Sequence, residues 1–196
     1  AAPVPLVTVQ TEDSERFTSG STEVDRVLGG GVIPGSYLLI GGDPGIGKST
    51  LMLQIADKVG LQGKTVLYVA GEESPYQIKM RADRLGLSSD NVLVFPQTDV
   101  HQVIEEIRTT RPAFVIIDSI QSIYSPTLSG TPGSVGQIKE CAGMLMHVAK
   151  ALGVTICLVG HVTKEGAVSG SPLPRGPRET KICRIGVASD EAFSFY

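Results

Sequence analysis

The sequence predicts an α/β fold in which a mostly parallel, twisted β-sheet is flanked by helices on both faces. Five short apolar runs alternate with segments of helical spacing, and they occupy residues 37–40, 65–70, 92–95, 113–117 and 154–160. Runs that are apolar throughout are typical of parallel strands buried on both faces of a sheet. In such a doubly wound domain, ligands bind at the carboxyl ends of the strands.

Helices are expected between these runs. The first covers residues 21–28, where Ser21 or Thr22 would cap the amino end and three glycines after Leu28 would stop the helix. In the other segments, apolar residues recur at helical spacing, which predicts helices over residues 48–59, 75–85, 100–108 and 137–152.

The composition bounds the class of protein. A chain of 196 residues predicts one domain, which we place at residues 20–196 after a polar, proline-containing lead-in at residues 1–19. A hydrophobic content of 41% with 19% charged residues excludes a largely disordered chain. The net charge of −3 provides no global basic field for nucleic acid, and 5% aromatic residues argue against base stacking as the main theme.

The cysteines and the hydropathy pattern bear on location. Cys141, Cys157 and Cys183 lie far apart and form no CxxC pair, which argues against a disulfide framework or a zinc knuckle. No apolar run approaches the ~18–20 residues that span a bilayer, and no secretory signal is recognisable. We therefore expect a cytoplasmic protein without a membrane partner.

The strongest motif follows the first apolar run. It matches G-x-x-x-x-G-K-[ST] at every defined position and reads Gly42-Asp43-Pro44-Gly45-Ile46-Gly47-Lys48-Ser49-Thr50. Its glycines let backbone N–H groups point at phosphate oxygens, and the following helix adds its positive end. Lys48 would contact the β- and γ-phosphates, Ser49 would bind Mg²⁺ and Thr50 would support the α-phosphate. We expect a nucleoside triphosphate site rather than an ordinary glycine-rich turn.

Acidic residues at strand ends are the candidate partners of this loop. Asp118 ends the fourth apolar run and would hold Mg²⁺ together with Ser49. Glu72, after the second run, is our first choice for orienting or deprotonating the attacking water, and Glu73 is the second. Each of these carboxylates could instead favour a helix start. His161 would sense the γ-phosphate by a hydrogen bond, or serve the structure alone.

Four further segments carry a more specific signal. They read Thr22-Glu23-Val24-Asp25-Arg26-Val27-Leu28-Gly29-Gly30-Gly31, Gly71-Glu72-Glu73-Ser74, Ile117-Asp118-Ser119-Ile120-Gln121 and Gly160-His161-Val162-Thr163-Lys164-Glu165-Gly166. The first of them resembles the entry segment of the RecA-like recombinase and KaiC group. The other three, together with the phosphate loop, resemble more narrowly the RadA (Sms) family of bacterial DNA-repair ATPases. The similarity runs from about Arg16 to Ala167.

This resemblance implies a RecA-like P-loop NTPase core that uses ATP and Mg²⁺. The family's Walker residues fall on Lys48, Ser49, Thr50 and Asp118, and its catalytic carboxylate falls on Glu72. The resemblance further implies a homo-oligomeric ring, expected to be a hexamer. Such a ring would act with a recombinase protein on single-stranded DNA and drive branch migration of recombination intermediates.

Parts of the family pattern find no match in this chain. These are an amino-terminal four-cysteine zinc finger, a Lon-protease-like domain and a Lys-Asn-Arg-Phe-Gly motif, so we interpret the chain as an ATPase core. Residues 167–180 are expected to form a disordered or shortened loop. Residues 179–196 weakly resemble the closing strands of this family or of the archaeal and eukaryotic strand-exchange recombinases.

Two glycine-rich segments, residues 125–136 and 164–178, would face the channel of such a ring. The second carries Lys164, Arg175 and Arg178, which would contact the DNA backbone. The first lacks cations and would bind only through backbone N–H groups. Both segments could instead be ordinary surface loops.

Other functions stay open. Lys181 and Arg184 are candidates for cations that reach the γ-phosphate of a neighbouring subunit, or for exposed strand charges. The alternative to a DNA motor is a KaiC-like ring ATPase that signals through protein partners. A small-molecule kinase is disfavoured because no arginine-rich lid appears between residues 85 and 100.

Overall fold

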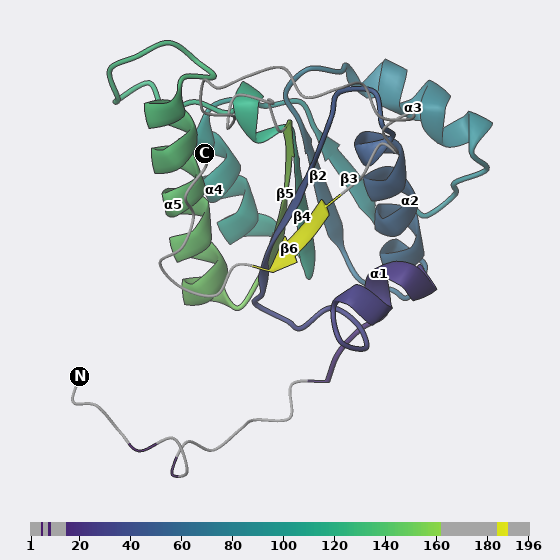
Figure 1. Cartoon of the computed structure of the whole chain (residues 1–196). Coiled ribbons are helices and arrows are strands. Elements are labelled where there is room, and N and C mark those ends of the chain that lie inside the picture. The colour runs from purple at the N-terminus through teal and green to yellow at the C-terminus, as the bar shows by residue number, and fades with distance from the viewer. Residues whose placement is uncertain (1–4, 6–7, 9–14, 162–183, 188–196) are drawn as a thin grey trace, which may run out of the picture.

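A computed structural model of the chain describes residues 5, 8, 15–161 and 184–187. The strands are β1 (Tyr37–Gly42), β2 (Val66–Ala70), β3 (Val92–Phe95), β4 (Phe114–Asp118), β5 (Thr155–His161) and β6 (Arg184–Val187). They form one six-stranded sheet in the order β3-β2-β4-β5-β1-β6 (Figure 1). The first five run parallel, and β6 pairs antiparallel with β1 at one edge.

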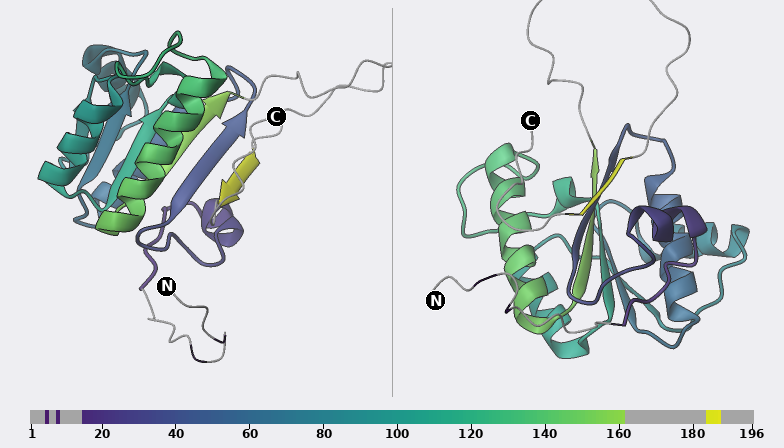
Figure 2. Two further views of the ribbon diagram at one scale, coloured as in Figure 1. Left: turned by 90° about the vertical axis from the view of Figure 1, so that its left-hand side faces the viewer. Right: turned by 60° about the horizontal axis from the view of Figure 1, so that its bottom comes forward.

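Helices cover both faces of this sheet. They are α1 (Thr22–Val27), α2 (Lys48–Gly60), α3 (Pro75–Arg84), α4 (Val100–Thr110) and α5 (Val135–Leu152), with a short 3-10 helix η2 (Ile120–Ser122) after β4. Helices α1, α2 and α3 lie on one face, and α4 and α5 lie on the other (Figures 1 and 2). The predicted fold class, a mostly parallel sheet between helices, is confirmed.

Each predicted strand and helix is present, with ends displaced by at most two residues. Strand β1 continues through Gly42 because Gly41 and Gly42 stay in register with Gly160 and His161 of β5. Strand β4 ends on Asp118 itself, which pairs in register with Ala70 and Val159. The local signals at the helix starts also hold: Ser21 caps α1 through a hydrogen bond from the backbone of Val24.

The core has two parts because successive residues of each buried strand point to opposite faces. Side chains such as Val69, Ile117 and Leu158 pack toward α4 and α5. Their sequence neighbours, among them Tyr68 and Ile116, pack toward α1, α2 and α3. Both faces are covered, which explains why the strands read as continuous apolar runs.

The end of the expected lead-in joins the core. Phe17 is 7% exposed and its backbone pairs with Val32. Its ring packs edge-to-face on Phe114 at 6.2 Å between centroids. The predicted boundaries, residues 1–19 and 20–196, otherwise stay a prediction, and the loop expected at residues 167–180 lies outside the described residues.

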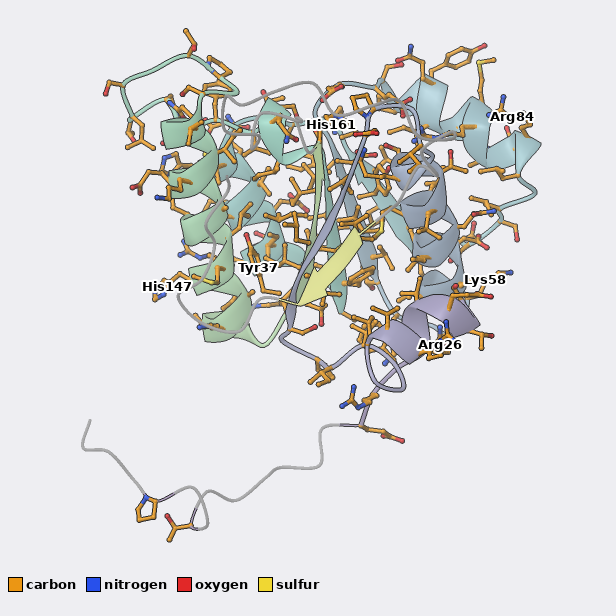
Figure 3. All side chains as sticks on the ribbon, viewed as in Figure 1. Arg26, Tyr37, Lys58, Arg84, His147 and His161 are labelled. Atoms are coloured by element: carbon orange, nitrogen blue, oxygen red, sulfur yellow. The ribbon has the colours of Figure 1, made fainter. Side chains whose placement is uncertain are left out.

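The carboxyl ends of the parallel strands meet at one edge of the sheet, at the top of Figure 1. The phosphate loop follows β1 there, the Glu72 segment follows β2, and His161 ends β5 (Figure 3). Parallel pairing thus gathers chemically distinct side chains from distant parts of the sequence. In the described part of the chain, no helix combines the length and apolar character needed to cross a membrane.

Candidate nucleotide-binding site

The phosphate loop connects β1 to α2 through two glycines in left-handed backbone conformations. Gly45 has φ 76° and Gly47 has φ 101°, values at which side chains are strained. Gly47 is also the N-cap of α2, so no side chain caps the first turn. The N–H groups of that turn are therefore left for an external acceptor, and an anion is the ligand that a helix N-terminus favours.

Lys48 is the first residue of α2, and its side chain bends back over the loop. It is 4% exposed, and its Nζ donates to the carbonyl oxygens of Gly42 at 2.7 Å and Asp43 at 2.9 Å. Among the described residues no carboxylate forms an ion pair with it. A buried ammonium group whose acceptors are neutral carbonyls suits an anionic ligand.

Asp118, at the end of β4, has both carboxylate oxygens engaged. Ser49 Oγ, in the first turn of α2, donates to Oδ1 at 3.0 Å. Tyr68 Oη, in the middle of β2, donates to Oδ2 at 2.5 Å. Burial raises the pKa of Tyr68 far above its ordinary value, and the charge of Asp118 raises it further, so this hydroxyl stays protonated.

Glu72 lies beside Asp118 because β2 and β4 are neighbours. The backbone N–H of Gly71 donates to the carbonyl oxygen of Asp118 at 3.0 Å, which extends the pairing past the strand end. Ser119 Oγ then donates to Glu72 Oε1 at 2.7 Å. A Cβ at Gly71 would lie 1.8 Å from Ser122 Oγ, so only glycine allows the turn after β2 to pass this close to Ser122 of η2.

Glu73 has a different environment. It forms a two-point ion pair with Arg81 of α3, at 3.1 Å to Nη1 and 2.7 Å to Nη2. The Arg81 side chain is 14% exposed, so this pair is partly shielded from water. Of the two candidate carboxylates, Glu73 is thus tied to the fold, and Glu72 is the one that Ser119 holds at the strand ends.

His161 completes the group. Its Nδ1 is buried and has no hydrogen-bond partner among the described residues, while its carbonyl oxygen accepts from Gln121 Nε2 at 3.2 Å. A buried ring nitrogen without a partner is suited to a polar ligand. The side chains around it form a cavity of about 100 Å³ lined by Ser49, Ala70, Glu72, Glu73, Asp118 and His161.

The structure therefore brings Ser49, Glu72, Asp118 and His161 together beside the loop that holds Lys48. Sequence reasoning missed Tyr68 and Ser119, the two hydroxyls that hold the carboxylates. A signal for Tyr68 existed, since a tyrosine within a wholly buried strand needs a partner for its hydroxyl.

The remaining predicted residues are placed only in part. Lys164, Arg175, Arg178 and Lys181 lie outside the described residues. Arg184 is the first residue of β6, opposite Gly41 in the register.

In the first segment predicted to face DNA, one side chain bridges several backbone groups of the loop. The buried Gln137 of α5 accepts from the backbone of Ser125 at 2.9 Å and donates to the carbonyls of Ser125 and Leu128, both at 3.2 Å. A side-chain amide that bridges a loop in this way satisfies the loop's own backbone.

The donor set near Asp118 fits Mg²⁺. A serine hydroxyl and one carboxylate are hard oxygen ligands, and Mg²⁺ usually adds waters and substrate phosphates to one or two such groups. The described residues contain no cluster of three or more His, Cys, Asp or Glu side chains that could hold a metal ion. Two protein oxygens are enough for Mg²⁺ when waters and nucleotide phosphates supply its other ligands.

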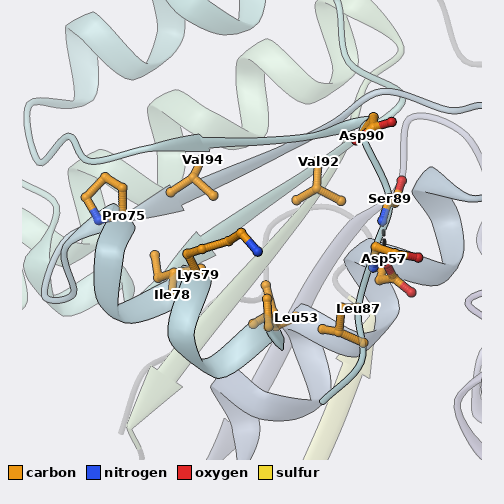
Figure 4. A pocket seen from close by; sticks show the side chains of 12 residues that line it. Leu53, Asp57, Pro75, Ile78, Lys79, Leu87, Ser89, Asp90, Val92 and Val94 are labelled. Atoms are coloured by element: carbon orange, nitrogen blue, oxygen red, sulfur yellow. Dashed lines mark hydrogen bonds between the residues drawn. The ribbon is translucent and has the colours of Figure 1, made fainter. Parts of the chain in front are cut away.

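A second hollow lies between α2, α3 and β3, with a volume of about 210 Å³ (Figure 4). Its wall is largely apolar and includes Leu53, Ile78 and Val92. Its buried carboxylate, Asp57, accepts from the backbone N–H groups of Ser88 and Ser89 at 2.8 Å each. Because the fold itself supplies hydrogen-bond donors to Asp57, this carboxylate is a weaker candidate for ligand binding than the carboxylates at the strand ends.

Comparisons with known proteins identify the family of the chain. A family model described as an AAA domain matches residues 3–167. The chain is 47% identical over 173 residues to the DNA repair protein RadA of Halalkalibacterium halodurans, covering 88% of this chain and 38% of that protein. It is 50% identical to RadA of Pseudomonas aeruginosa, over 84% of this chain and 36% of the relative.

These relatives are longer than the present chain, which spans a little over a third of their length. Among solved structures, a KaiC-like protein of Pyrococcus horikoshii superposes with a TM-score of 0.64 at 22% identity. The match covers 76% of this chain and 71% of that one. At this identity the likeness concerns the fold alone.

Proposed function

Because this chain belongs to the AAA-domain family and to the RadA group of bacterial DNA repair proteins, we propose that it is the ATP-hydrolysing core of a motor that acts on DNA. The observation that carries the proposal is the meeting of Ser49, Asp118 and Glu72, from three separate elements, around one cavity. The phosphate loop and Lys48 lie directly beside it, because Lys48 and Ser49 are adjacent in α2.

ATP and Mg²⁺ are the proposed cofactors. The N–H groups of the loop and the Lys48 ammonium would hold the phosphates, with residues 42–50 as the cradle. Ser49 and Asp118 would hold Mg²⁺, which when bound neutralises charge on the phosphate oxygens. The hydrogen bond that already joins Ser49 to Asp118 supports this pairing.

Glu72 is the proposed general base. Ser119 occupies its Oε1, and in the described part of the chain Oε2 has no donor, so this oxygen is the one to accept a proton from water. His161 Nδ1 would form a hydrogen bond to the γ-phosphate, which would give the buried nitrogen a partner. Proton removal by a positioned carboxylate typically accelerates such a step about 10²–10⁴-fold.

Single-stranded DNA is the proposed polymer substrate. Lys164, Arg175 and Arg178 would contact its phosphates, and three such contacts give a salt slope of only about 2–3 per subunit. Tight binding therefore requires several subunits, which supports a homo-oligomeric ring, proposed as a hexamer. In this ring Lys181 or Arg184 would reach a neighbour's γ-phosphate, and a recombinase protein would supply branched intermediates for branch migration.

The test is ATP hydrolysis by this chain with and without single-stranded DNA, at low and moderate salt. We expect DNA to stimulate hydrolysis, and salt to weaken the stimulation. Replacing Lys164, Arg175 and Arg178 with alanine should abolish the stimulation and preserve the basal rate. A matched control replaces three exposed helix cations instead, namely Lys58, Arg84 and Arg108, and should retain the stimulation.

The outcomes separate the candidate functions. Hydrolysis that ignores DNA would favour a ring ATPase directed at protein partners. Transfer of the γ-phosphate to a small molecule, with little transfer to water, would favour a kinase. Absence of Mg²⁺-dependent hydrolysis would contradict the assignment of Ser49, Glu72 and Asp118.

A further inference from the structure

We propose that Tyr68 is a positioning residue whose hydroxyl holds the Asp118 carboxylate in the orientation that binds Mg²⁺. This inference rests on the proposed function, because it assigns a role within the same site. Its starting point is a buried side chain that neither the motifs nor the phosphate loop accounts for. Tyr68 is 0% exposed and lies in the middle of β2.

The register of the sheet explains how the two side chains meet. Strands β2 and β4 are parallel neighbours, with Tyr68 opposite Ile116 and Ala70 opposite Asp118. Tyr68 therefore starts two residues below the strand end, and its ring reaches along the sheet to the carboxylate. Its hydroxyl donates to Oδ2 at 2.5 Å, on the sheet face that α2 covers.

The two oxygens of Asp118 thus have separate partners. Oδ1 faces Ser49, the other proposed Mg²⁺ ligand, at 3.0 Å. Oδ2 is held from the β2 side by Tyr68. A carboxylate fixed at one oxygen keeps its other oxygen in place, so the Tyr68 bond presents Oδ1 to the metal position. Ser49 alone would leave the carboxylate free to rotate once the metal competes for that hydroxyl.

The hydroxyl of Tyr68 is the donor in its hydrogen bond with Asp118, because a carboxylate oxygen can only accept. It is buried among apolar side chains, and it faces a carboxylate, so its pKa is raised well above its ordinary value. Arg81 and Glu73, the charged groups that approach it from α3 and from the turn after β2, neutralise each other as an ion pair. The geometry at Asp118 thus makes Tyr68 the donor that holds Oδ2 from the β2 side.

Residues that hydrogen-bond to a metal ligand affect metal binding even though they do not touch the metal. Removing a group that orients a metal ligand typically costs about 10–100-fold in metal affinity or activity. A merely structural hydroxyl would change the stability of the fold and leave the metal dependence unchanged. The metal dependence is thus the quantity that separates the two roles.

The experiment compares wild-type chain with Tyr68→Phe, which keeps the ring and removes one oxygen atom. Binding of a fluorescent ATP analogue is titrated with Mg²⁺ and repeated in EDTA, and hydrolysis is titrated with Mg²⁺ in parallel. We expect the Mg²⁺ concentration at half-saturation to rise about tenfold, with analogue affinity in EDTA unchanged within about twofold.

Tyr37→Phe is the matched control. Tyr37 is also buried, at 3% exposed, and its hydroxyl donates to the carbonyl oxygen of Ala142 at 2.8 Å on the opposite face of the sheet. Its loss removes a similar buried hydrogen bond away from Asp118. We expect this variant to keep the wild-type Mg²⁺ dependence.

A second measurement needs no variant. In chain labelled with ¹³C at the hydroxyl-bearing carbon of tyrosine, addition of Mg²⁺ and ATP should shift the Tyr68 resonance and leave that of Tyr37 in place. An unchanged Tyr68 resonance, or a Tyr68→Phe variant with the wild-type Mg²⁺ dependence, overturns the Tyr68 role while wild-type hydrolysis stands. A wild-type chain whose nucleotide binding ignores Mg²⁺ overturns the proposed function as well.

Discussion

Ser119 donates a hydrogen bond of 2.7 Å to Glu72, and this bond joins the ends of two neighbouring strands. The residue before Ser119 is Asp118, and its backbone carbonyl oxygen accepts a hydrogen bond from the N–H of Gly71. The proposed base and the proposed metal ligand are thus fixed to each other through backbone and side chain. In the proposed function, a connection of this kind would set the distance between the metal and the attacking water.

The choice between Glu72 and Glu73 is open to a direct test. Glu72→Gln should still bind ATP and should hydrolyse it about 100-fold more slowly or worse, because an amide cannot accept the proton of the attacking water. Glu73→Gln should keep most of the hydrolysis rate and lose stability, because it breaks the ion pair with Arg81. Single-turnover hydrolysis and urea unfolding of both variants make the comparison. A slow Glu73→Gln beside an active Glu72→Gln would reverse the assignment.

Lys48→Ala should abolish hydrolysis. The ammonium is buried and donates to two loop carbonyls, so its removal takes away the charge that compensates the β- and γ-phosphates. Nucleotide affinity, measured by calorimetry, should fall together with turnover. Turnover above about a tenth of wild type would count against the phosphate-loop role of this lysine.

The strands and the phosphate loop could be predicted because their signals are local. Continuous apolar runs mark buried parallel strands, and the spacing of Gly42, Gly47 and Lys48 carries its own chemistry. The partners of Asp118 and Glu72 could not be predicted in this way. These contacts depend on β2 lying next to β4 with Ala70 opposite Asp118. The two residues are 48 positions apart, so no local sequence pattern indicates their pairing.

The difference between Glu72 and Glu73 has the same origin. Both follow β2 directly, and both precede a helix, so the sequence ranks them only by motif. Arg81 decides between them, because from the second turn of α3 its guanidinium forms an ion pair with Glu73. Which carboxylate meets Arg81 thus depends on how α3 packs after the strand end, a tertiary property.

Asp57 should contribute strongly to stability without contributing to catalysis. It is 4% exposed and accepts from two backbone N–H groups, those of Ser88 and Ser89. Asp57→Ala leaves both donors unpaired, which should lower the free energy of unfolding by about 2–4 kcal/mol. Urea unfolding measures this loss, with the exposed neighbour Asp90→Ala as the control. Equal stability of the two variants would show that water replaces the carboxylate.

Asp25 should make the fold weaker in acid. Burial alone would raise the pKa of Asp25, but hydrogen bonds from the Thr18 hydroxyl and from the backbone N–H of Ser19 outweigh it and lower the pKa below its ordinary value. A carboxyl whose pKa is depressed on folding stabilises the protein above the unfolded pKa, and this stabilisation is lost as the pH falls through the folded value. Asp25→Asn should therefore be less stable than wild type at neutral pH.

The pH dependence of that difference is the decisive measurement. Between wild type and Asp25→Asn, the gap in unfolding free energy should be constant above about pH 5. It should narrow as the pH falls below about 4, where the Asp25 carboxylate of the unfolded wild-type chain begins to be protonated. Thr18→Val removes one of the donors to Asp25. At neutral pH this variant should be less stable than wild type, and its unfolding free energy should lie closer to that of Asp25→Asn. A free-energy gap that stays constant down to about pH 2 would contradict this prediction. It would mean that Thr18 and Ser19 bind the protonated Asp25 as well as the carboxylate. The packing of Val24, and not the charge of Asp25, would then hold α1 in place.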